Sequence, residues 1–289
     1  MIKLTIFANF RIDSPERYLR MKDSFLSFKD ISSDEWVINV RGKYKKKTLQ
    51  FLQQYLGEKL YSFELESTKG WLHDTRKMLE KINGDYVLFW IEDHINQVNI
   101  EKYDQILAEM KKTNSDHLFY SWFGSSNFLE NLRNTSLQNI KTLTINKEIV
   151  DKVEKENNSF FYMISAVSIS SIYLFRKIIQ SNHPFLKRWP KVTPFDFEKR
   201  STDTEFIPFN LSIPNYELFA SIDDNLGMKN YSLIDRGEYP DRVLREELIN
   251  EEYRPVKFIQ TLKEALPQNV YKLLSKVYIF FKRVFYTLK

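Results

Sequence analysis

Three side chains able to hold a metal ion or a proton follow one another at Glu92, Asp93 and His94. They come directly after an apolar run at residues 86–91, which begins behind a Gly-Asp turn signal. A run of this length is too short to span a membrane and is typical of a strand buried on both faces of a sheet. Because open α/β sheets bind ligands outside the carboxyl ends of their strands, we expect a binding site here.

The chemistry of these three side chains favours a divalent cation. Carboxylate oxygens suit Mg²⁺ or Mn²⁺, and an imidazole suits Mn²⁺ better than Mg²⁺. Since side chains alternate along a strand, Glu92 and His94 are expected on one side and Asp93 on the other. Such a cluster can hold one cation, and the cation can hold a diphosphate. The alternative is a solvated strand end with chance acidic residues.

The residues before this cluster alternate between strand and helix patterns. Strands are expected at residues 3–9, 36–40, 59–65 and 86–91. A first helix is expected from a Ser-Pro start at residue 14, with apolar positions up to residue 28. A second, basic helix is expected after residue 43 and ends near residue 55, and a third is expected over residues 71–82. This alternation predicts an α/β fold with a parallel sheet and right-handed crossovers.

The second half of the chain has a weaker pattern. The apolar spacing predicts a helix over residues 99–112, a strand over 117–122, a strand over 160–169 and a helix over 170–180. Residues 127–158 are polar, and we expect a helix, a short strand and a mobile loop there. The chain is expected to form one α/β domain over residues 1–245, followed by a C-terminal extension over residues 246–289.

Composition narrows the class of protein. The chain has 289 residues, a net charge of +5 and no cysteine, so disulfides, zinc–thiolate sites and thiol nucleophiles are excluded. With 7 glycines and no glycine-rich phosphate loop, kinase and dehydrogenase functions are disfavoured. Basic proteins tend to bind phosphate groups, but no nucleic-acid module is recognisable. The first residues lack the apolar core of a signal peptide, so a cytoplasmic location is expected.

The last residues predict a basic amphipathic helix. Over residues 270–289 the apolar positions recur every three or four residues, and every formal charge is positive. Such a helix has too many charges to span a bilayer, but it fits an anchor lying in the plane of an anionic membrane surface. We expect membrane association through residues 267–289. The alternative is a helix packed on its own domain or on a second subunit.

The order of these elements resembles a known family. A basic strand end at Arg41 is followed by a helix that leads into Gly84, Asp85, Tyr86 and an apolar strand ending in acidic residues. This order is similar to that of GT-A glycosyltransferases, in particular the inverting bacterial enzymes that build surface polysaccharides. The resemblance covers residues 3–125 well and the remainder loosely. It implies a GT-A-like (Rossmann-like) mixed, mostly parallel sheet flanked by helices.

The resemblance also implies site residues. Glu92, Asp93 and His94 stand where the family has an Asp-x-Asp motif that binds the ribose and the metal of a nucleotide sugar. The strand ends at residues 8–11 and 39–41 match the regions that frame the nucleotide base, and Arg76 can reach phosphate. The implied cofactor is Mn²⁺ or Mg²⁺, with a nucleoside diphosphate sugar as co-substrate. The implied nucleotide-sugar-binding residues are Ala8, Asn9, Arg11, Asn39, Arg41, Asp74, Arg76 and Glu92.

An inverting transfer needs a carboxylate that takes the proton of the acceptor hydroxyl. In the resembling enzymes this base lies roughly a hundred residues after the metal motif, which points to Glu198 here. Asp196, Asp203 and Glu205 are the other candidates. These acids can instead be solvated loop residues or ion-pair partners of neighbouring basic residues.

The sequence as a whole predicts a glycosyltransferase on the inner face of the cell membrane. It would transfer a sugar from a nucleoside diphosphate sugar to a membrane-held glycan or lipid-linked acceptor, in surface polysaccharide synthesis. The alternatives are a nucleotidyltransferase-like enzyme and a non-catalytic sugar- or nucleotide-binding protein on the same fold. No nucleic-acid partner is expected. The sequence gives no oligomeric state.

Overall fold

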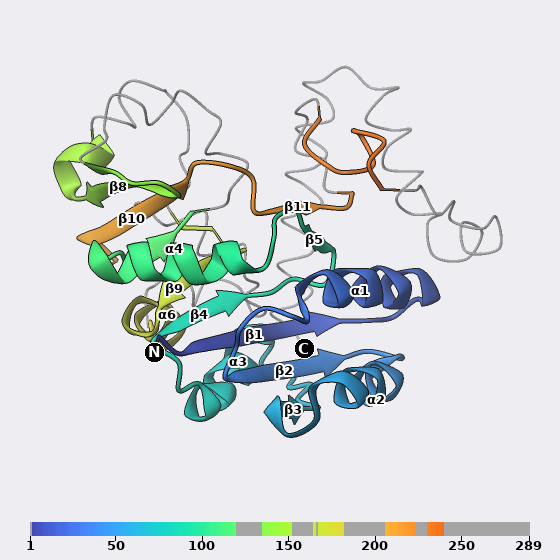
Figure 1. Ribbon diagram of the computed structural model, residues 1–289. Helices are drawn as coiled ribbons and strands as arrows, with labels where there is room; N and C mark the ends of the chain where they lie inside the picture. The colour runs from blue at the N-terminus through green and yellow to red at the C-terminus, as the bar shows by residue number, and fades with distance from the viewer. Residues whose placement is uncertain are drawn as a thin grey trace, which may run out of the picture. The chain divides into compact units, whose positions relative to one another are not determined.

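The computed structural model describes residues 2–119, 135–151, 164–165, 167–181, 206–223 and 230–239. Those up to Glu238 belong to one compact unit. Within this part of the chain a nine-stranded sheet carries helices on both faces, and a separate two-stranded sheet lies beside it (Figure 1). The predicted α/β fold class is therefore confirmed.

The first hundred residues alternate strand and helix as predicted. The elements are β1 (Leu4–Arg11), α1 (Pro15–Phe28), β2 (Glu35–Arg41), α2 (Lys45–Leu56), η1 (Gly57–Lys59), β3 (Leu60–Phe63), α3 (Trp71–Met78), η2 (Leu79–Lys81), β4 (Tyr86–Phe89) and β5 (His94–Asn96). Strand β1 pairs in parallel with both β2 and β4, and β2 pairs in parallel with β3. Helical crossovers are what such parallel neighbours require.

The later elements agree with the predicted positions in part. They are α4 (Glu101–Lys112), β6 (His117–Leu118), β7 (Thr135–Ser136), β8 (Ile140–Ile145), β9 (Ser168–Ser171), α6 (Ile172–Gln180), β10 (Phe209–Pro214) and β11 (Phe219–Ser221). Helix α6 begins two residues later than predicted. The reason is that Ser170 and Ser171 still pair with β4, and the Ser171 side chain then caps the helix by accepting the N–H of Leu174.

The strand order across the large sheet is β3-β2-β1-β4-β9-β6-β10-β8-β7. The pairings make β9 and β8 run opposite to the other strands, so the sheet is mixed and mostly parallel, as predicted. From β1 the chain turns to one side for β2 and β3 and then crosses to the other side for β4. This reversal between β1 and β4 is the topological switch point at which such sheets bind ligands.

The two faces of the sheet have separate cores. Helices α1, α2 and α4 bury their apolar stripes on one face, in a cluster that includes Phe25, Leu52 and Ile106. Helices α3 and α6 cover the other face, where Trp71 and Phe175 are buried (Figure 1). Side chains alternate along each strand, so two consecutive residues of β1, or of β2, project into opposite cores. This fixes the direction in which each strand-end residue projects.

A tight junction fixes β4 against β1. A Cβ atom at Gly84 would lie 2.6 Å from the backbone nitrogen of Thr5, so a side chain has no space there. The Gly84 N–H donates to Thr5 Oγ1 at 2.9 Å, and Glu35 accepts both the Thr5 hydroxyl and the Asn83 N–H at 2.6 Å. The Gly-Asp signal before the apolar run thus sets the register of β4.

The predicted C-terminal extension lies outside the described residues. Its boundary after residue 245 and the amphipathic helix over residues 267–289 therefore stay predictions. None of the helices in the described part of the chain is long and apolar enough to cross a membrane.

Candidate functional site

The acidic cluster sits in a turn rather than on a strand. Strand β4 ends at Phe89, and the His94 N–H donates to the Ile91 carbonyl at 3.3 Å, which places Glu92 and Asp93 at the tip of a turn. His94 then begins β5, which pairs with β11. The prediction that Glu92 and His94 share one side of a continuous strand is therefore wrong, because alternation holds only while the strand is unbroken.

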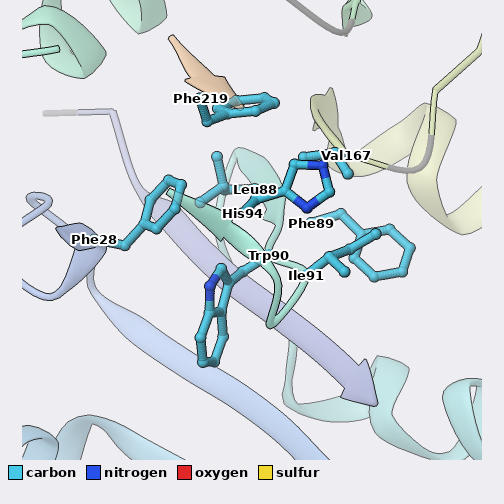
Figure 2. Close-up of a pocket in the computed structure, with 8 residues that line it drawn as sticks. All are labelled: Phe28, Leu88, Phe89, Trp90, Ile91, His94, Val167 and Phe219. Carbon is cyan, nitrogen blue, oxygen red and sulfur yellow. The ribbon is translucent and has the colours of Figure 1, made fainter. Parts of the chain in front are cut away.

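His94 is held in place by packing and holds Asp93 in turn. Its Nδ1 lies 2.8 Å from Asp93 Oδ1, and the residue is only 3% exposed. Figure 2 shows the imidazole among apolar side chains that include Leu88, Phe89 and Phe219, in a pocket without room for a water molecule. A ring fixed in this way orients the carboxylate that it contacts.

The two carboxylates of the turn have different proton affinities. Burial raises the pKa of Glu92 to about 8, and the negative charge of Asp93 adds to this effect, while Arg17 and His94 oppose it. Burial acts in the same direction on Asp93, but the hydrogen bond and charge of His94 outweigh it and hold the pKa of Asp93 below its ordinary value. Glu92 therefore binds a proton more readily than Asp93 does.

This pair has the chemistry of a partial cation site. Within the described residues no three His, Asp or Glu side chains converge in a way that could hold a metal ion. Mg²⁺ and related hard cations are commonly held by one or two carboxylates together with substrate phosphates. Two adjacent carboxylates that compete for one proton fit such a shared site. In such a site Glu92 and Asp93 would be the ligands. His94, which was predicted as a third ligand, contacts Asp93 through Nδ1.

Two arginines lie side by side at the carboxyl edge of the sheet. Arg11 of β1 and Arg41 of β2 are register partners. Arg11 donates to Glu66 from two nitrogens at 2.8 and 2.6 Å, and its Nε lies 3.3 Å from Asp13. The Arg11 side chain is thus engaged within the protein.

Arg41 differs from its neighbour. Its Nε is buried and has no hydrogen-bond partner. Burial lowers the pKa of Arg41, and the charge of Arg11 adds to this, while Asp74, Glu66 and Glu92 act against it. The group stays a cation at neutral pH because arginine has a very high intrinsic pKa. The residue is half-buried at the carboxyl end of β2.

Asn9 and Asn39 form an internal network. Asn9 Nδ2 donates to Thr75 Oγ1 at 2.9 Å, and Asn39 Nδ2 donates to Asn9 Oδ1 at 2.9 Å. Asn39 also accepts the N–H of Leu65 at 2.7 Å and donates to its carbonyl at 3.0 Å. Trp71 Nε1 donates to the Asn9 carbonyl at 2.8 Å. These amides position the loop after β3 and the start of α3.

Asp74 and Arg76 also have partners within the protein. Asp74 is 1% exposed and accepts the backbone N–H of Ser67. Arg76 donates from Nε to the Ile179 carbonyl at 2.9 Å and from Nη2 to the Ser181 carbonyl at 2.6 Å. Both donors therefore face the carboxyl end of α6. The phosphate contact of Arg76 stays a prediction.

The remaining predicted residues divide in two groups. Ala8 is completely buried within β1, so its side chain presents no surface to a ligand. The predicted catalytic acids lie outside the described residues, and their roles stay predictions: Asp196, Glu198, Asp203 and Glu205.

Two charged residues of the site were missed in the sequence. Arg17 acts on Glu92 and Asp93 from the first turn of α1, and Glu66 binds Arg11 from the loop after β3. Arg17 carried a usable signal, because a cation in the first turn of a helix opposes the helix dipole. Glu66 carried none, since a single acid in a polar loop is ordinary.

Comparison with known proteins supports the fold. No protein-family model and no curated protein matches the chain. The chain is similar in structure to residues 1–349 of TarS from S. aureus in complex with UDP, with a TM-score of 0.50 and 14% identity over 93% of this chain and 82% of that chain. At this identity the likeness shows the fold alone, and it agrees with the predicted GT-A-like sheet.

Two further likenesses are weaker. In another structure of TarS 1–349 the TM-score is 0.49 with 16% identity, and the match covers 76% of this chain but only 60% of that one. The mannosyltransferase PcManGT from Pyrobaculum calidifontis, in complex with GDP-Man and Mn²⁺, gives a TM-score of 0.38 with 7% identity over 61% of this chain and 46% of that chain.

Proposed function

We propose that the chain is a glycosyltransferase that takes a sugar from a nucleoside diphosphate sugar and passes it to a glycan or lipid-linked acceptor at a membrane. The observation that carries the proposal is the turn with Glu92 and Asp93, which follows β4 beside the switch point between β1 and β4. A ligand bound there meets two carboxylates and the cation of Arg17. A diphosphate with its counter-ion fits this combination, because the carboxylates can bind the cation and the arginine can attract the phosphates.

The residues of the turn have complementary tasks in this proposal. Asp93, kept ionised by His94, and Glu92, which gives up its proton when a cation binds, would hold Mn²⁺ or Mg²⁺ against the diphosphate. The bound metal would supply neutralisation of the charge that grows on the leaving diphosphate. Arg17 adds a fixed positive charge near the same carboxylates. His94 keeps Asp93 in one orientation.

The acceptor hydroxyl is the nucleophile in this transfer. One carboxylate takes the proton of the acceptor hydroxyl while the hydroxyl oxygen attacks the anomeric carbon. The nucleoside diphosphate leaves from the opposite side, so the centre is inverted. We assign this base to Glu198, or to Asp196, Asp203 or Glu205, on the sequence argument alone. The fold likeness to a protein solved with UDP supports a nucleotide as donor but does not identify the sugar.

The test is turnover of a panel of nucleotide sugars with Mn²⁺, followed by release of the nucleoside diphosphate. Glu92→Gln combined with Asp93→Asn should lower the rate by at least about a hundredfold, a size typical for loss of electrostatic stabilisation. Asp104→Asn, an exposed acid on α4, is the matched control and should retain full activity. Full activity in the double variant would remove the proposal.

The released product separates the alternatives. Sugar transfer releases a nucleoside diphosphate, whereas nucleotidyl transfer releases pyrophosphate. A thermal shift with nucleotide sugars, but no turnover of any of them, would indicate a non-catalytic binding protein. Both outcomes are read from the same protein preparation.

A further inference from the structure

A serine on α1 reaches the turn that carries the two carboxylates. Ser24 is completely buried, and its hydroxyl donates to the His94 carbonyl and lies 3.4 Å from the Ile91 carbonyl. Trp90 Nε1 donates to the same hydroxyl oxygen at 2.8 Å. The hydroxyl therefore contacts both the residue before the acidic pair and the residue after it.

The local sequence gives no reason for a serine at this position of the helix. Alanine favours a helix more than serine does, and a serine hydroxyl inside a helix often bonds to the carbonyl four residues earlier. The partners of the Ser24 hydroxyl instead lie 66 to 70 positions further along the chain. A completely buried hydroxyl with all these partners in one distant segment stabilises that segment rather than its own helix.

The backbone of the turn is held by two separate elements. The Ile222 N–H, which follows β11, donates to the Asp93 carbonyl at 2.8 Å, whereas Ser24 binds the next carbonyl from α1. One helical turn after Ser24, Ser27 Oγ accepts the Asn96 N–H at 3.0 Å and attaches β5 to the same helix (Figure 1). The position of the turn is thus set by contacts outside its own sequence.

Helix α1 also carries the cation that acts on both carboxylates. Arg17 lies seven residues before Ser24, and its charge favours the ionised forms of Glu92 and Asp93. Residues at this spacing project from the same face of a helix. A shift of the turn along α1 would change the distance between this charge and the carboxylates, and the hydroxyl of Ser24 opposes such a shift.

We propose that Ser24 is a positioning residue of the donor site. Its hydroxyl holds the turn against α1, so that Glu92 and Asp93 keep one arrangement relative to each other and to Arg17 when they bind a cation together with a diphosphate. This inference rests on the proposed function. Replacing groups that orient the ligands of a metal commonly lowers metal affinity by about 10–100-fold.

The test is calorimetric titration of the whole chain with GDP, CDP, UDP and ADP, each with and without Mn²⁺. Ser24→Ala removes the hydroxyl and keeps a residue that favours the helix. It should weaken the tightest Mn²⁺-dependent complex by at least about tenfold, and it should change nucleotide affinity without Mn²⁺ by less than about twofold. Ser24→Cys, whose S–H is a weak donor, should also weaken the Mn²⁺-dependent complex. It keeps the test usable where the Ala variant does not fold.

Ser212→Ala is the matched control. Ser212 is also completely buried, lies on β10 three strands away from β4, and donates to Ser115 Oγ at 2.5 Å. Removing this hydroxyl leaves a buried hydrogen bond unmade and lowers the melting temperature, as Ser24→Ala does. Because Ser212 is remote from the turn, the Mn²⁺-dependent affinity should change by less than about twofold.

The outcomes separate this inference from the proposed function. Wild-type affinity and wild-type Mn²⁺ dependence in folded Ser24→Ala would overturn the inference. An equal loss of affinity in Ser212→Ala would do the same, since the loss would then follow from stability alone. If the wild type binds no nucleotide, or binds all four independently of Mn²⁺, the proposed function fails as well.

Discussion

Glu92 and Asp93 are adjacent carboxylates with unequal chemistry. Asp93 has a histidine partner, whereas burial and the charge of Asp93 disfavour the ionised form of Glu92. The cation that we propose would remove this imbalance by replacing the proton that the pair shares. At the scale of single residues, the site therefore contains a buried carboxyl group whose ionisation is unfavourable.

The raised pKa of Glu92 predicts a pH dependence of stability. The folded protein holds a proton on Glu92 up to about pH 8, whereas the unfolded chain releases it near its ordinary value of 4.5. The stability that this proton contributes is present below pH 4.5 and is lost as pH rises through 8. In the absence of metal, Glu92→Gln should thus raise the melting temperature relative to wild type at pH 9 and not at pH 4.

Thermal unfolding at the two pH values measures this difference. Glu80→Gln, which changes an exposed acid, is the matched control and should show no such pH-dependent gain. An equal effect of Glu92→Gln at pH 4 and pH 9 would contradict the raised pKa. Addition of Mn²⁺ should reduce the advantage of the variant, since the cation stabilises only the wild-type pair.

At the scale of elements, the two helices behind the sheet are joined by Arg76. Its two donors bind carbonyl groups at the end of α6, where a positive charge also complements the helix dipole. Arg76→Met should lower the free energy of unfolding by about 1.5–3 kcal/mol, the range for hydrogen bonds to charged groups. Denaturant unfolding measures this loss.

The neighbouring Lys77→Met supplies the control, because Lys77 is exposed on the same helix. It should change stability by less than about 0.5 kcal/mol. A stable Arg76→Met variant that has lost nucleotide affinity would instead support the phosphate contact predicted from the sequence.

A buried histidine joins β6 to β9. The Ser165 N–H donates to His117 Nε2 at 3.1 Å, so Nδ1 carries the proton and donates to Ser170 Oγ at 2.9 Å. Burial lowers the pKa of His117 to about 3 from 6.5. The unfolded chain protonates His117 at a higher pH than the folded protein does. The free energy of unfolding therefore decreases as pH falls from 6.5 towards 3.

His117→Gln should therefore be less stable than wild type at pH 7 but should lose less stability between pH 7 and pH 4. Denaturant midpoints at the two pH values measure the change. His73→Gln is the control, since His73 is only half-buried on α3. An unchanged acid sensitivity in His117→Gln would show that other groups cause it.

At the scale of the whole molecule, the sequence predicts the sheet better than the site. The buried run at β4 and the strand–helix alternation depend on local patterns, and both are confirmed. The partners of Asn39 and Arg76 come from Leu65 and from the end of α6, and no local pattern links them. The end of β4 at Phe89 was also missed, because apolar residues continue through the bend.

At the same scale, the sequence predicts membrane association through the C-terminal residues. Deletion of residues 267–289 should release the protein from vesicles that contain anionic lipid, because a basic amphipathic helix would supply both apolar contact and charge attraction. Co-sedimentation measures binding. Replacing Lys45, Lys46 and Lys47 by Gln removes three positive charges elsewhere and is the control. Unchanged sedimentation of the deletion variant would count against an anchor.

The central claim is that Glu92 and Asp93 hold a cation against the diphosphate of the donor. Titration of the whole chain with nucleoside diphosphates, with and without Mn²⁺, tests it most directly. At least one nucleotide should bind with Mn²⁺ and lose at least about tenfold in affinity without it, and the Glu92→Gln, Asp93→Asn double variant should lose this dependence. Nucleotide binding with the same affinity and the same Mn²⁺ dependence in the double variant would contradict the account.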